Sequence, residues 1–156
     1  MGTFKTKLKK ILPSIVTCIY GEWKYRDVIK KYREGQKNIK KRKNDHTLPK
    51  VAFIIQFPEV WNSIYTVYEA ARKAGIPTLL LSVPKAEVNY SSTYTVSLDG
   101  RNEAYDFFCE KNIEAVNAYD CEHQSWYDLK EFEPDYVFYA RPYNSQYPEC
   151  YRSNVV

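Results

Sequence analysis

Short, continuous apolar runs alternate with segments of helical period from residue 50 onward. The run Lys50–Gln56 is rich in β-branched and aromatic residues, which is typical of a strand buried on both faces of a parallel sheet. In Trp61–Ala74 the apolar residues recur at helical spacing, and Gly75 followed by Pro77 marks the end of this helix. Thr78–Val83 is the next apolar run. This order predicts a strand, helix, strand unit with a right-handed crossover.

The same alternation continues along the rest of the chain. We expect a short extended segment at Tyr90–Ser97, helices at Asn102–Asn112 and His123–Phe132, strands at Ile113–Asn117 and Pro134–Ala140, and a last helix over Ser145–Arg152. Four strands alternating with helices predict a three-layer, Rossmann-like α/β domain with a mostly parallel sheet. A strand order of about 3-2-1-4 would place the first and fourth strands side by side, and ligands of such sheets bind beyond the carboxyl ends of the strands at this switch point.

A different pattern precedes residue 50. From Glu22 to about Lys43 there is no Pro, and apolar residues recur at roughly helical spacing among charges, which predicts a basic helix. The polar segment Asn44–Pro49 follows as a linker. We therefore divide the chain into a basic arm and linker, residues 1–49, and an α/β domain, residues 50–156.

The charge is distributed unevenly between these two parts. Residues 1–50 hold 15 Lys and Arg against 4 Asp and Glu, whereas residues 51–156 hold 8 against 15, so the net charges are +11 and −7. Such an arm can contact anionic lipid, nucleic acid or its own acidic domain. Zinc-finger ligands, a glycine-rich clamp and an RNA-binding sheet signature are all missing from the sequence, so nucleic acid is not an expected partner.

The arm also contains an apolar stretch, residues 11–20, directly after four lysines. It is too short to span a bilayer, and no small-residue cleavage site of a signal peptide follows it. Two interpretations remain open: residues 1–43 lie along an anionic membrane surface, or they form a leader helix that docks on protein. We expect a cytoplasmic protein, with the inner face of the cell membrane as a candidate location.

The cysteines and histidines do not indicate a metal, redox or catalytic site. Cys18, Cys109, Cys121 and Cys150 have no metal-binding or redox spacing, so we expect buried, reduced thiols and no metal site. His123 lies beyond the third predicted strand, and a lone histidine there is more typical of a polar surface residue than of a general acid or base. No cofactor is expected in this chain.

The loops of the expected switch point lack the common phosphate and hydrolase motifs. No glycine-rich dinucleotide or Walker-type loop follows the first strand, and no nucleophile elbow is present. The two loops, Gln56–Ser63 and Arg141–Tyr147, combine amides, a hydroxyl, aromatic rings and one arginine instead. Rings stack on sugar faces, amides exchange hydrogen bonds with hydroxyls, and arginine binds phosphate through two donors, so the loops indicate recognition of a polyol or a phosphate.

The candidate substrate-binding residues are Gln56, Trp61, Ser63, Arg141, Tyr143, Gln146 and Tyr147. Each aromatic has an alternative role in packing, with Trp61 at the start of its helix and the two tyrosines under the sheet. Arg141 has an alternative partner in Glu149.

Several of these blocks occur in one order that resembles a known family. They are residues 51–56 (VAFIIQ), residues 61–65 (WNSIY) leading to 68–70 (YEA), residues 134–138 (PDYVF) and residues 141–148 (RPYNSQYP). Over residues 22–153 the chain resembles the amino-terminal domain of CDP-glycerol glycerophosphotransferases and related transferases of teichoic acid and capsule synthesis.

The resemblance implies a GT-B transferase with two Rossmann-like domains. Such enzymes move glycerol phosphate from CDP-glycerol to a growing cell-surface polymer at the cytoplasmic membrane face, and this half would carry the acceptor side. The family's nucleotide-binding and catalytic residues belong mainly to the second domain. We therefore expect a fragment that precedes a carboxyl-terminal nucleotide-binding domain and is inactive alone, and we assign it no catalytic residue. The alternative is a self-contained binding or membrane-docking α/β module.

Overall fold

The computed structural model describes residues 2–85, 100–142, 144–153 and 155. It consists of two compact units, residues 1–34 and 35–156. Helix α1, Gly2–Asn44, provides all of the described first unit and extends into the second. The helix expected from Glu22 is confirmed, and in the structure it begins much earlier, at Gly2. Among the described residues, no helix combines the length and the apolar character that crossing a bilayer would require.

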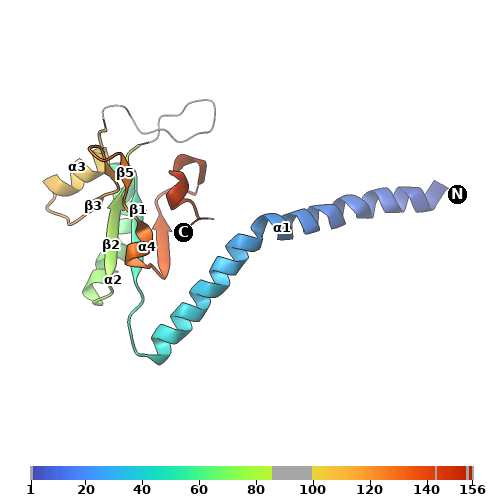
Figure 1. Ribbon diagram of the computed structural model, residues 1–156, viewed down its shortest axis with the longest axis horizontal. Coiled ribbons are helices and arrows are strands. Elements are labelled where there is room, and N and C mark those ends of the chain that lie inside the picture. The colour runs from blue at the N-terminus through green and yellow to red at the C-terminus, as the bar shows by residue number, and fades with distance from the viewer. Residues whose placement is uncertain (1, 86–99, 143, 154, 156) are drawn as a thin grey trace. The chain divides into compact units, whose positions relative to one another are not determined.

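The second unit is built on a parallel sheet (Figure 1). Its strands are β1 (Val51–Ile55), β2 (Thr78–Ser82), β3 (Val116–Asn117) and β6 (Tyr136–Tyr139), in the order β3-β2-β1-β6. The helices are α2 (Trp61–Lys73), α3 (Glu103–Glu110) and α4 (Leu129–Phe132). The first and fourth strands of the predicted sheet therefore lie side by side. The expected Rossmann-like order is confirmed.

Apolar residues on both faces of the sheet make this a three-layer structure. On one face, Phe53 packs with Tyr68 of α2 and Phe108 of α3. On the other face, Ile54 packs with Leu129 of α4 and with the carboxyl-terminal tyrosines. Strand β1 is buried along its whole length because it lies between these two layers, as its unbroken apolar sequence predicted.

Helix α2 ends where the sequence placed its end. Gly75 has a φ of +70°, a left-handed conformation that glycine adopts without a Cβ clash. The N–H of Gly75 donates to the carbonyl of Arg72, and the N–H of Ile76 donates to that of Ala71. This pair of bonds is a Schellman motif, which satisfies the last carbonyls of the helix and turns the chain into β2.

A buried polar network joins the carboxyl ends of β2 and β3. Asn102 precedes α3 and accepts hydrogen bonds from the backbone of Tyr105 and from the Ser82 hydroxyl. Its amide donates to the Ser82 carbonyl and to the Asn117 side chain, at 2.9 and 2.8 Å. One buried side chain thus caps a helix and fixes the ends of two strands.

Asp135 performs a similar task at the opposite, amino end of the sheet. Its carboxylate accepts the N–H of Lys50 at 2.7 Å and lies 2.6 Å from Nε of Arg42 in the last turn of α1. The arginine contact does not have hydrogen-bond angles, so its attraction is mainly Coulombic. Residues 35–44 of α1 are therefore attached to the starts of β1 and β6.

Two expected helices are wrong. In place of a helix over His123–Phe132 the chain forms an antiparallel pair, β4 (Tyr119–Asp120) with β5 (Ser125–Trp126), and helix remains only in α4. The Asp120 carboxylate accepts the N–H groups of Glu122 and His123, and Gln124 has a φ of 50°, so a tight turn replaces the helix.

The last stretch forms two 3-10 turns, η2 (Asn144–Gln146) and η3 (Glu149–Tyr151), in place of the helix expected over Ser145–Arg152. Pro148 between them is extended, with a ψ of 150°, which interrupts helical geometry. The third strand is shorter than expected, and Tyr90–Ser97 lies outside the described residues.

Candidate functional site

The carboxyl ends of β1 and β6 open into a depression of about 390 Å³. Its lining consists of Gln56, Phe57, Glu59, Val60, Lys85, Arg141 and Gln146. The first residues follow β1, Lys85 follows β2, and Arg141 and Gln146 follow β6, so the parallel sheet brings three loops to one edge. This is the switch point at which ligands bind in doubly wound sheets.

Gln56 lies at the base of this site. It follows β1 directly and is 1% exposed. Its Nε2 donates to the carbonyl of Gln146 at 2.7 Å, which fixes the amide orientation, but its Oε1 is buried and has no hydrogen-bond partner among the described residues. A buried acceptor without a donor costs about 1–3 kcal/mol. Unpaired buried acceptors of this kind occur at sites where a ligand or a small rearrangement completes the hydrogen bonds.

Arg141 is the arginine of the lining. Its guanidinium carbon lies 4.0 Å from the centre of the Phe57 ring, and its NH1 donates to Oε1 of Gln146 at 3.3 Å. Its backbone N–H donates to the hydroxyl of Tyr147 at 3.0 Å. The planar group is thus held against a ring and an amide, while an arginine has five N–H donors in total.

Lys85 adds a second cation on the same rim. Its Nζ lies 5.7 Å from the centre of the Phe57 ring, within the usual range of a cation–π contact. Glu59 is the acidic residue of the lining, so two cations face one carboxylate. The chemistry of the depression favours a ligand that combines negative charge with hydroxyl groups.

The structure separates the predicted site residues. Gln56, Arg141 and Gln146 line the depression. Ser63 is exposed on α2 and is not part of the lining, and Tyr143 lies outside the described residues.

The packing alternative holds for Trp61 and Tyr147. Trp61 is 4% exposed and meets Phe108 edge to face, with ring centres 4.9 Å apart. Tyr147 is 1% exposed and packs against Tyr139 under the sheet. Neither ring face is open to a sugar, because each fills the core beside a loop.

Phe57, Glu59, Val60 and Lys85 are lining residues that were not among the predicted site residues. The sequence could have identified Lys85 as a site residue, because it follows the second predicted strand and the carboxyl ends of parallel strands share an edge. The sequence could not have identified Phe57, because its role depends on the position of Arg141, which is distant in sequence.

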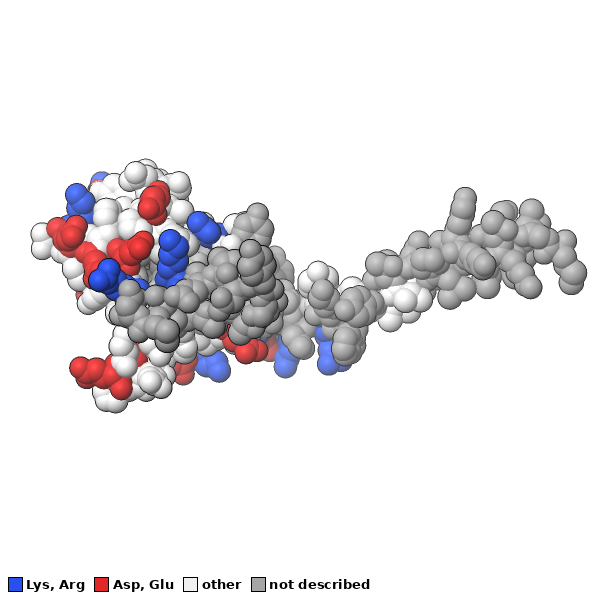
Figure 2. Space-filling view, turned by 90° about the horizontal axis from the view of Figure 1, so that it is seen from above, with Lys and Arg blue, Asp and Glu red and all other residues white. Residues whose placement is uncertain are grey.

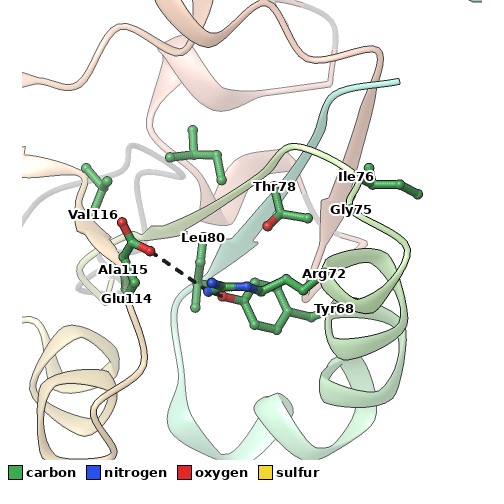
Figure 3. Close-up of a pocket in the computed structure, with 10 residues that line it drawn as sticks. Tyr68, Arg72, Gly75, Ile76, Thr78, Leu80, Glu114, Ala115 and Val116 are labelled. Carbon is green, nitrogen blue, oxygen red and sulfur yellow. Dashed lines mark hydrogen bonds and ion pairs between the residues drawn. The ribbon is translucent and has the colours of Figure 1, made fainter. Parts of the chain in front are cut away.

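A second depression, of about 310 Å³, lies where β2 and β3 begin (Figure 3). Arg72 extends from α2 toward Glu114, donates to the Tyr68 hydroxyl at 2.9 Å and lies 3.9 Å from a Glu114 carboxylate oxygen. Its cation is already balanced by Glu114, and it lies at the amino ends of the strands. We therefore assign function to the depression at the carboxyl ends.

His123 belongs to a surface turn. Its Nδ1 lies 2.7 Å from Oδ2 of Asp120, and both side chains are exposed. The hydrogen bond from the His123 side chain, with those from the backbone, lowers the pKa of Asp120 below its ordinary value. The pair stabilises the turn between β4 and β5, in agreement with the surface interpretation.

The cysteines of the described part differ from expectation in one respect. Cys109, Cys121 and Cys150 are unpaired, but they are exposed, whereas we expected buried thiols. In the portion of the chain that the structure describes, no cluster of His, Cys, Asp and Glu could hold a metal ion.

Comparison with known proteins yields no relative: no family model, no curated protein and no solved structure matches this chain. The site's geometry and chemistry therefore carry the functional argument.

Proposed function

We propose that this chain is the acceptor-side domain of a transferase resembling the CDP-glycerol glycerophosphotransferases of teichoic acid and capsule synthesis. The observation that carries the proposal is the depression at the carboxyl ends of β1 and β6, with Gln56, Arg141 and Lys85 around it. Its ligand is a polyol phosphate or glycan end of a growing cell-surface polymer. The residues that bind the CDP-glycerol donor and catalyse the transfer are assigned to a second, nucleotide-binding domain.

Five residues of the lining have a role in this binding. Arg141 and Lys85 attract the phosphate, and the planar arginine binds two of its oxygens while Phe57 fixes the guanidinium plane. Gln146 lies beside the arginine and Gln56 lies beside Gln146, where their amides can exchange hydrogen bonds with ligand hydroxyls. In this proposal the domain binds and orients an acceptor and does not activate it.

Binding by the chain itself tests this role. Glycerol 3-phosphate and a short glycerol phosphate oligomer are titrated into the protein, with glycerol and inorganic phosphate as separate probes, and affinities are measured by calorimetry. We expect the oligomer to bind best, since it supplies both phosphate and hydroxyls. Arg141→Ala should weaken that binding about tenfold or more, because a charge-assisted hydrogen bond is lost.

Arg72→Ala is the matched control, because it removes an arginine from the other depression. It should leave the oligomer's affinity unchanged. Equal losses in the two variants, or no binding of any phosphate probe by the wild-type protein, would contradict the proposal. A transfer assay with CDP-glycerol is run in parallel, and the chain alone should bind the oligomer without extending it.

The second candidate is a self-contained α/β module that docks on a membrane through α1. Val16 and Ile19 are exposed apolar residues of this helix, within a part of the chain that is strongly basic. An anionic membrane, at the cytoplasmic face, suits such a helix. Vesicle binding by a protein that binds none of the phosphate probes would favour this candidate over the transferase domain.

A further inference from the structure

Strand β6 is the end strand of the described sheet, and only one of its two edges is paired. It bonds to β1 in parallel, with Phe53 opposite Phe138. The N–H groups of Tyr136 and Ala140 donate to the carbonyls of Lys50 and Ile54. The backbone N–H and C=O groups of the even-numbered residues of β6 therefore face β1. Alternation along a strand directs the backbone N–H and C=O groups of Val137 and Tyr139 outward. Among the described residues, no backbone hydrogen bond to these groups is formed.

The sequence of this short edge strand contains none of the residues that usually block pairing. The four residues of β6 include no charge, proline or glycine. Natural edge strands are normally blocked by lysine, proline, a bulge or a covering segment. Tyr136 and Phe138, on the face shared with α2, are 43% and 41% exposed. An open edge and a half-exposed aromatic face therefore coincide on one strand.

We propose that β6 pairs antiparallel with β6 of a second copy of this chain, about a two-fold axis perpendicular to the sheet. A register with Phe138 on the two-fold axis places the outward-facing residues of the two copies opposite each other. Val137 of one copy lies opposite Tyr139 of the other, so each pair exchanges both backbone hydrogen bonds. Phe138 then lies opposite Phe138 of the second copy, at a non-hydrogen-bonded position where Cα atoms approach to about 4.5 Å.

The charges that flank β6 fit this arrangement. Glu133, which is exposed, precedes the strand and Arg141 follows it, whereas Asp135 is buried and already paired with Arg42. Antiparallel pairing places the acidic end of each strand beside the basic end of the other, whereas parallel pairing would place like charges together. The two-fold axis also keeps the half-exposed rings of both copies on one face, where Phe138 and Tyr136 shield each other from water. A second copy is thus the partner that this edge matches in hydrogen bonding, shape and charge.

The proposal is independent of the function assigned to the depression, and it is tested by molecular mass in solution. Light scattering and sedimentation of the full chain, over low to high micromolar concentration, should show a concentration-dependent dimer. Phe138→Lys should give a monomer, because two like charges would meet on the axis. Tyr65→Lys is the matched control: Tyr65 is an equally exposed aromatic residue, on α2 beside Trp61, and its replacement should leave the dimer intact.

Val137→Pro provides a second variant that acts through the backbone. It removes an outward N–H, leaves the bonds toward β1 in place, and should also abolish the dimer. Circular dichroism verifies that each variant is folded. Hydrogen exchange of the wild-type protein should show Val137 and Tyr139 amides protected at high protein concentration and released on dilution.

A wild-type monomer throughout this concentration range would overturn the proposal. So would a dimer that survives both Phe138→Lys and Val137→Pro, because its interface would then lie elsewhere, for example along α1. Unprotected Val137 and Tyr139 amides in a dimeric protein would lead to the same conclusion.

Discussion

Asp135 illustrates how one residue acquires a role from its surroundings. In the sequence it is a single acidic residue beside a proline at the start of a strand. In the structure its side chain is 2% exposed and contacts the Lys50 backbone and Arg42. A buried carboxylate is tolerated because a donor and a cation both face it. Nothing in the local sequence predicts Arg42 as its partner, because the two residues are far apart in the chain.

Tyr147, which is buried, and Tyr139, which is partly buried, make the protein's stability depend on pH in the alkaline range. Burial raises the pKa of Tyr139 and of Tyr147 above the ordinary phenol value. The neutral phenol is therefore favoured in the folded state. Its contribution to stability is complete below the unfolded-state pKa of about 10 and is lost as pH rises toward the folded-state pKa.

We predict that Tyr139→Phe stabilises the protein, most of all above pH ~10, where the wild-type phenol ionises in the unfolded chain. The Tyr139 hydroxyl is buried without a hydrogen-bond partner among the described residues, so its removal should increase the free energy of unfolding by about 1 kcal/mol even at neutral pH. Urea denaturation across neutral and alkaline pH measures both effects. Tyr32→Phe, at an exposed position of α1, should change neither. A loss of stability in Tyr139→Phe would show that its hydroxyl has a partner.

At the scale of elements, buried parallel strands and amphipathic helices were predictable. β1 has an unbroken apolar sequence, and β2 has three successive leucines, because both faces of these strands are covered. Helix α2 shows its apolar stripe and its Gly75 terminus in the sequence. The β4–β5 pair was not predictable from periodicity. Each strand has two residues, too few for a period, and the turn depends on the side chain of Asp120.

We predict opposite effects of the same replacement at two glycines. Gly75→Ala should destabilise the protein by about 1 kcal/mol, because alanine is strained in a left-handed conformation. A Cβ at this position would meet only Leu48, at 4.0 Å, so the cost arises from the backbone and not from crowding. Chemical denaturation measures the change.

Gly35→Ala is the matched variant within α1, where an added Cβ has open space. Alanine should favour this helix by up to about 1 kcal/mol, and circular dichroism on heating should show greater helix retention. The interpretation of Gly75 as a helix terminus fails if Gly75→Ala is as well tolerated as Gly35→Ala.

At the scale of the whole molecule, the distribution of charge is the dominant feature. The basic excess belongs to the part of the sequence that forms α1, and the acidic excess belongs to the α/β domain. Figure 2 shows Asp and Glu side chains interspersed with Lys and Arg on the presented face of the α/β unit. Long-range attraction to an anionic surface should therefore act through the helix.

We predict that the full chain binds vesicles containing phosphatidylglycerol and does not bind vesicles of phosphatidylcholine alone. Lys40→Gln with Lys41→Gln should weaken binding about tenfold or more, since each lysine near an anionic surface contributes about 1 kcal/mol. Binding is measured by co-sedimentation at low and high salt, and high salt should reduce it.

Lys73→Gln with Lys130→Gln is the control, because it removes the same charge from the α/β unit. It should bind as the wild-type protein does. Equal weakening in both double variants would indicate a response to net charge, and binding to neutral vesicles would indicate that lipid charge is not the determinant.

The sequence by itself determined the fold class, the strand order and the location of the candidate site. These follow from local patterns: continuous apolar runs, helical periods and the rule that parallel strands direct their carboxyl ends to one edge. Gln56, Arg141 and Gln146 could be selected because they follow strands that adjoin in the sheet. The tertiary structure alone decided which loop residues face solvent and which fill the core. Trp61 and Tyr147 became packing residues, and Phe57 and Lys85 became site residues, because side-chain burial depends on contacts between segments that are distant in sequence.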